Sequence, residues 1–158
     1  MKRNAVWPVL LAVFLLAGCV KTKYTPVNAQ TIAKTVEKYD GLTQTVQSGD
    51  SFSADYPEAL IARVLFANEK GGWSGEFWEF DSETAAKACF ARLNGAAEPS
   101  FSFVPSDEYD RFEITLADGA QPVLKAMRVQ NTVLLVSCRD TEESRGAVSK
   151  LLVTLGYN

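Results

Sequence analysis

Two periods of apolar residues follow each other along the chain, and each predicts a different kind of element. Where apolar residues recur every three or four positions, the pattern predicts a helix with one buried face. The first such segment begins at Asn28, a favourable helix cap, and stops at Gly41. Three helices are predicted in all, over residues 28–41, 81–95 and 140–157.

Runs rich in aromatic and β-branched residues predict strands between these helices. Residues 60–80 contain two such runs separated by the turn sequence NEKGG, which predicts a β-hairpin. The first run also fits one face of a helix beginning after Pro57, an alternative that the pattern leaves open. Residues 43–59 are polar and predict a loop with a short edge strand. Further strands are predicted over residues 111–117, 123–129 and 132–138, the last two forming a second hairpin.

This order of elements predicts an α+β fold. An antiparallel sheet with its helices packed on one face, a two-layer sandwich, is the simplest arrangement of two hairpins that are each followed by a helix. The series strand, Asp, helix, Gly occurs at residues 80–95 and again at 138–156, which indicates a weak internal ββα duplication. The alternative is that a helix after a strand is simply a common local order.

The N-terminus has a different pattern. Lys2 and Arg3 precede an apolar stretch over residues 5–16, which is the layout of a secretory signal peptide. Polar residues follow immediately after Cys19, so the apolar stretch is shorter than the roughly 20 residues of a spanning helix. We therefore expect residues 1–18 to be a removable leader.

The sequence Leu16-Ala17-Gly18-Cys19 resembles the lipobox of bacterial lipoprotein precursors. The resemblance covers only this signal region. It implies that the Cys19 thiol receives a diacylglyceryl group and that a dedicated peptidase cuts just before this residue. A cleavable signal with a chance cysteine is the alternative interpretation. Two or more acyl chains anchor a protein stably, so the resemblance implies a membrane partner held through lipid on Cys19.

The expected organisation is a leader over residues 1–18, a lipidated tether over 19–30 and a single globular domain over 31–158. Val20 rather than Asp follows the cysteine. By resemblance to lipoprotein sorting, this favours the outer membrane in an organism with two membranes. The expected location is thus the cell envelope.

Charge and composition narrow the classes of function. The chain has 16 basic and 19 acidic residues, and loss of Lys2 and Arg3 leaves 14 against 19, a net charge of −5. An acidic domain is poorly suited to nucleic acid. The absence of histidine excludes Ser-His-Asp and Cys-His catalysis and histidine zinc sites. No catalytic residue, cofactor or metal site is predicted.

Cys89 and Cys138 remain once Cys19 is assigned to lipid. Cys89 lies in an apolar stripe of a predicted helix, and Cys138 alternates with apolar residues of a predicted strand, so both side chains point inward. In an exported compartment such cysteines tend to pair, which predicts a disulfide. Two separate buried thiols are the alternative.

Trp73 is the candidate for contact with a partner, because glycines and Ser74 flank it near a turn and the indole can present an amphipathic surface. The ring is expected to stay partly exposed at this turn, although ordinary packing is the favoured interpretation over a binding role. Glu76 and Glu79 are expected on opposite faces of one strand, so they are not expected to act as an acid and base pair.

Two classes of function follow from these observations. The favoured class is a lipid-anchored envelope protein with a non-enzymatic binding or accessory role, whose partner is an envelope protein, a polymer or a small ligand. The alternative is a membrane-tethered hydrolase that uses carboxylates or a metal without histidine. Convergence of two carboxylates in one cleft would favour the enzyme.

Overall fold

The computed structural model describes residues 25–39, 41–48, 59–96, 109–114 and 123–157. Three helices and six strands lie in these ranges. In chain order they are α2 (Ala29–Val36), β1 (Thr43–Ser48), β2 (Leu60–Asn68), β3 (Trp73–Phe80), α3 (Glu83–Ala96), β4 (Tyr109–Ile114), β5 (Val123–Val129), β6 (Thr132–Cys138) and α4 (Glu142–Leu155).

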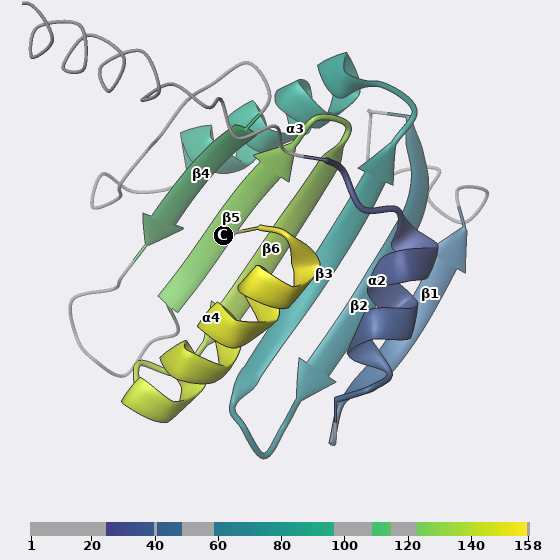
Figure 1. Cartoon of the computed structure of the whole chain (residues 1–158). Helices are drawn as coiled ribbons and strands as arrows, with labels where there is room; N and C mark the ends of the chain where they lie inside the picture. Colours follow the sequence, from purple (N-terminus) through teal and green to yellow (C-terminus); the bar gives the residue numbers. More distant parts are fainter. Residues whose placement is uncertain (1–24, 40, 49–58, 97–108, 115–122, 158) are drawn as a thin grey trace, which may run out of the picture.

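The six strands form one antiparallel sheet in the order β1-β2-β3-β6-β5-β4 (Figure 1). The predicted α+β class with an antiparallel sheet is confirmed, as are both hairpins and the edge strand β1. The helical alternative for the run after Pro57 is wrong, because Leu60–Asn68 pairs along its length with β3. β3 and β6 form the centre of the sheet.

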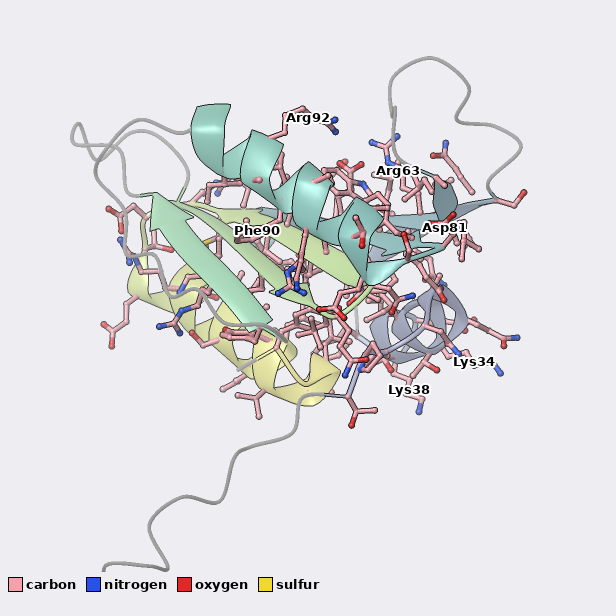
Figure 2. All side chains as sticks on the ribbon, turned by 90° about the horizontal axis from the view of Figure 1, so that it is seen from above. Lys34, Lys38, Arg63, Asp81, Phe90 and Arg92 are labelled. Atoms are coloured by element: carbon pink, nitrogen blue, oxygen red, sulfur yellow. The ribbon has the colours of Figure 1, made fainter. Side chains whose placement is uncertain are left out.

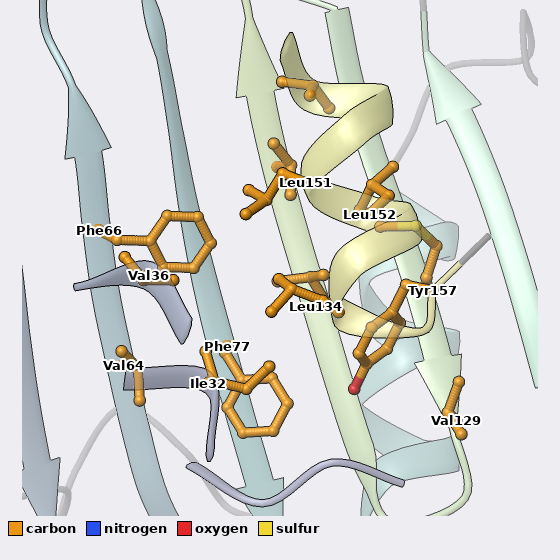
Figure 3. Close-up of a cluster of buried hydrophobic side chains, with 14 of the residues drawn as sticks. Ile32, Val36, Val64, Phe66, Phe77, Val129, Leu134, Leu151, Leu152 and Tyr157 are labelled. Carbon is orange, nitrogen blue, oxygen red and sulfur yellow. The ribbon is translucent and has the colours of Figure 1, made fainter. Parts of the chain in front are cut away.

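One face of the sheet is covered by α2 and α4 (Figure 3). Ile32 and Val36 of α2 and Leu151 of α4 are completely buried there, against Phe77 and Leu134 of the two central strands. Asn28 caps α2 by accepting a hydrogen bond from the Thr31 amide, and Thr141 caps α4 in the same way through Ser144. The caps fix where these two helices begin.

The other face of the sheet is covered by α3, which corrects the prediction that all helices share one face. Figures 1 and 2 show α3 on the opposite side of the sheet from α2 and α4, with Phe90 directed at the strands. Cys89 and Phe90 pack there on Trp78 and Val133. The physical reason is that the central strands are apolar on both faces, so each face needs a helical cover.

The strand order is the one that an internal duplication would give, whereas the placement of the helices is not. The sheet order reads outward from the β3-β6 pair as 3-2-1 on one side and 6-5-4 on the other. A two-fold axis perpendicular to the sheet, between β3 and β6, would relate two triplets in this order. The same axis would put both following helices on one face, whereas α3 and α4 lie on opposite faces.

The start of α2 is fixed to the sheet by a carboxylate. Glu79 near the end of β3 accepts a hydrogen bond from the Ala29 amide at 2.8 Å. A negative charge at this point also favours the positive end of the helix dipole. Ala29 is buried, so the packed domain begins before the boundary at residue 31 that the sequence suggested.

A buried tyrosine joins the C-terminal segment to the same region. Gly156 ends α4 in the left-handed conformation, and Tyr157 then turns back so that its hydroxyl lies 2.6 Å from Thr132 Oγ1. Burial raises the pKa of the Tyr157 hydroxyl well above its ordinary value, the charge of Glu79 raises it further, and the hydrogen bond with Thr132 lowers it. The neutral phenol is therefore the form that the fold accommodates.

Stability should fall at alkaline pH through Tyr157. The unfolded tyrosine ionises near pH 10, whereas the folded one keeps its proton, so unfolding above that pH releases a proton. We expect the free energy of unfolding to fall by up to about 1.4 kcal/mol per pH unit above pH 10 from this group. Tyr157→Phe should show a shallower loss in urea unfolding curves at a series of alkaline pH values. Equal alkaline losses in the two proteins would contradict this role.

Candidate functional site

The residues singled out by the sequence fall in different places. Cys19, the predicted lipid site, lies outside the described residues, so its modification stays a prediction. Glu76 and Glu79 lie on opposite faces of β3, as expected. Glu76 forms an ion pair with Arg63 and accepts a hydrogen bond from the Trp78 indole on the α3 side, while Glu79 contacts α2 on the other side. The sheet separates the two carboxylates.

The predicted disulfide between Cys89 and Cys138 is absent, and both residues are buried as reduced cysteines. Both side chains do point inward, but into different clusters. Cys138 joins the cluster beneath α2 and α4, and Cys89 joins the cluster beneath α3. A disulfide needs the two Cα atoms within about 7 Å and the side chains directed at each other, which the intervening sheet prevents.

Trp73 is more buried than the sequence suggested. Its side chain is only 6% exposed, and its ring meets Phe66 edge to face with centroids 6.3 Å apart. The prediction of a partly exposed ring is therefore wrong. Trp73 still lines two surface hollows.

The larger of these hollows lies between Tyr39, which follows α2, and the first half of α4; we call it the helix cleft. Its volume is about 720 Å³, and Trp73 and Asn68 form its floor. The Tyr39 hydroxyl donates a hydrogen bond to Thr154 Oγ1 at 3.0 Å, which joins the two walls beyond Lys150.

The floor of the cleft is held in place by the β2-β3 turn. Asn68 Oδ1 accepts a hydrogen bond from the Gly71 amide, and the Gly71 carbonyl accepts one from Ser144 Oγ of α4 at 2.7 Å. A Cβ on Gly71 would lie only 2.8 Å from Trp73 Nε1, so the turn packs closely on the indole. The turn, the indole and the start of α4 form one connected unit.

The indole N–H of Trp73 donates no hydrogen bond to any described residue, although the other described tryptophan, Trp78, donates to Glu76 at 2.6 Å. The Trp73 nitrogen is also not sealed off from solvent. A nearly buried donor without a protein acceptor costs free energy unless water or a ligand accepts its proton. This donor therefore remains available to a ligand in the hollows that Trp73 lines.

α4 presents a distinct sequence of side chains to the cleft. Glu142 and Glu143 lie at its first turn, Gly146 in the middle and Lys150 one to two turns further on. A helix rises about 1.5 Å per residue, so the acidic and basic ends are about 10 Å apart. Negative charge at one end of this helix segment and positive charge at the other make the cleft polar along its length.

Gly146 lies inside a 14-residue helix where a larger residue would fit. A Cβ added there would meet no atom within 4 Å. Glycine in a helix interior is about 1 kcal/mol less stable than alanine, so packing gives no reason for glycine at this position. Because glycine has no side chain, Gly146 adds no side chain to this wall of the cleft.

A second hollow, the sheet groove, lies on the face that α3 covers only in part. It has a volume of about 330 Å³ and is lined by aliphatic and hydroxyl side chains such as Leu65, Leu135, Thr45 and Ser137. A third hollow of about 390 Å³ at the β2-β3 turn shares Trp73 with the helix cleft. The helix cleft is the largest of the three and contains charges of both signs.

The comparisons with known proteins bear on the fold alone. No family model and no curated protein matches the sequence. A solved structure described as a GTP binding regulator, from Thermotoga maritima, has a TM-score of 0.51 and 16% identity, covering 84% of this chain and 90% of that chain. The likeness supports the α+β architecture.

Two kinds of feature are absent from the described ranges. None of their helices has the length and apolar character needed to cross a membrane. Nor does any group of three or more cysteine, aspartate or glutamate side chains in these ranges come together as a metal site.

Sequence reasoning found Trp73 but missed its neighbours in the cleft. Glu143, Gly146 and Lys150 lie in the predicted helix over residues 140–157, on its polar positions, and the apolar pattern that predicts the helix does not single them out. Gly146 was the signal in the sequence that could have indicated the cleft. A glycine inside a helical pattern destabilises the helix, so its presence there calls for a packing or functional reason. The pairing of α4 with the β2-β3 turn links residues 73 positions apart, which no local pattern indicates.

Thiol chemistry should confirm the separated cysteines. The Cys19→Ala chain, denatured without reductant, should react with two equivalents of a thiol reagent, because Cys89 and Cys138 are reduced. The folded protein should react far more slowly, since both thiols are buried. Cys89→Ala should remove one equivalent. Thiols that appear only after reductant is added would contradict the structure.

Proposed function

We propose that this protein is a lipid-anchored domain of the cell envelope that binds a partner without catalysing a reaction. The anchor part rests on Leu16-Ala17-Gly18-Cys19, and the binding part rests on the helix cleft. In an organism with two membranes, Val20 supports placement in the outer membrane. The single observation that carries the binding role is a preformed cleft holding an available Trp73 donor.

The position of the cleft suits a tethered binding protein. The tether enters the domain at Ala29, which Glu79 holds at one end of β3, and Trp73 begins the other end of the same strand. Glu79 and Trp73 are six positions apart along the strand, which is about 20 Å. Figure 1 shows the same arrangement, with the start of α2 and the β2-β3 turn at opposite ends of the sheet. If the tether is held at a membrane, the cleft lies at the end of the domain that is further from the membrane.

The enzymatic alternative has less support. It requires carboxylates that converge in one cleft, and Glu76 and Glu79 are separated by the sheet. Glu142 and Glu143 do lie in one cleft, but both are exposed in the first turn of α4, where they favourably oppose the helix dipole. A binding role needs no change in this arrangement, because exposed carboxylates can contact a partner directly.

The anchor can be tested at Cys19. The intact protein should float with membranes and carry the mass of a chain that begins at Cys19 with added acyl groups. Cys19→Ala should lose acylation and should not be cut before residue 19, so its mass should be that of the chain with its leader and without acyl groups. Ser51→Ala serves as a control with the leader unchanged. A natural product without fatty chains would contradict the proposal.

The binding site can be tested by placing a photo-crosslinking residue in the intact lipoprotein in cells. Position 150 lines the helix cleft, whereas position 149 is exposed on the same helix but does not line it. We expect a discrete crosslinked product from position 150 and not from position 149. Gly146→Leu, which fills the cleft, should abolish that product. Equal crosslinking from both positions would contradict a role for the cleft.

A further inference from the structure

We propose that the helix cleft is a site for a short extended peptide with a positive group at one end and a carboxylate at the other. This inference rests on the proposed binding function and names its ligand class. The positive group would face Glu142 and Glu143, and the carboxylate would face Lys150. Between them, a peptide carbonyl would accept the hydrogen bond that Trp73 Nε1 leaves unused.

The spacing of the charges sets the length of the peptide. Glu143 and Lys150 are seven residues apart on α4, which is about 10 Å along the helix axis. An extended chain covers about 3.3 Å per residue, so about three residues span the distance. A cleft with opposite charges at its two ends also fixes the direction in which such a peptide lies.

The indole N–H of Trp73 is a second observation that favours a peptide ligand. Trp73 is 6% exposed, yet its indole N–H has no acceptor among the described residues. A peptide backbone offers a carbonyl every residue, whereas an apolar ligand would leave the donor unsatisfied. The donor therefore favours a ligand with regularly spaced acceptors.

Gly146 explains how a backbone can reach this floor. Gly146 lines the cleft, and a Cβ at this position would meet nothing within 4 Å. Glycine lowers helix stability relative to alanine, and a local cost without a packing reason is typical of a functional position. The bare wall admits a peptide backbone between α4 and the indole.

The test is a titration of the intact protein in mild detergent, followed by NMR of the tryptophan indole N–H signals. Trialanine with free termini is the probe, and Trp73→Phe assigns the signal. We expect a saturable shift of the Trp73 signal with the Trp78 signal unchanged, because Trp78 already donates to Glu76. Trialanine with both ends capped should shift the Trp73 signal at least several-fold less.

Variants test the individual contacts. Lys150→Gln and Glu143→Gln should each raise the Kd of trialanine about two- to fivefold, the range for exposed ion pairs. Gly146→Leu should abolish the shift while keeping or raising the Tm, because leucine is the better helix former. Gly146→Ala should raise the Tm and weaken binding less.

The outcomes separate this inference from the proposed function. No shift at millimolar trialanine, or equal shifts with capped and uncapped peptide, would overturn the peptide site. A neutral disaccharide such as maltose that shifts the Trp73 signal when trialanine does not would overturn it in favour of a sugar. The crosslink from position 150 would survive each of these failures, and its loss would instead refute the cleft as a binding site.

Discussion

The structure depends on the burial of β3 and β6 on both faces. Phe77 and Trp78 are adjacent in β3, and Val133 and Leu134 are adjacent in β6, yet each pair is divided between the two core clusters. Successive strand residues point to opposite faces, so one apolar run must be covered twice. This requirement places α3 opposite α2 and α4. It also creates the partly uncovered α3 face and the gap between α2 and α4 where the hollows lie.

The sequence contained the signal for this arrangement. TVLLVSC has four consecutive apolar residues at positions 133–136, and FWEF places apolar residues on both faces of β3. Such runs are typical of strands with helices on each side. Period and turn residues sufficed for the elements and the antiparallel hairpins. The predicted disulfide assumes that two buried side chains share one core. Cys89 and Cys138 are both buried, but in two cores on opposite faces of the sheet.

The candidate site was predictable only in part. Trp73 shares the face of Phe77 by strict alternation, so its burial could be inferred once both faces were known to be covered. The cleft around it needs more, because its walls meet through long-range hydrogen bonds: Ser144 with Gly71, and Tyr39 with Thr154. Contacts between residues so far apart in sequence arise from tertiary packing and leave no periodic pattern in the chain.

These two hydrogen bonds also determine what kind of site the cleft is. One ties α4 to the β2-β3 turn, and the other ties α4 to Tyr39, so both walls are fixed before anything binds. A preformed site loses little conformational entropy on binding, which favours affinity for a small ligand. Gly146 then has a consistent role: the frame supplies rigidity at the two ends, while the glycine preserves space between them at a cost in helix stability.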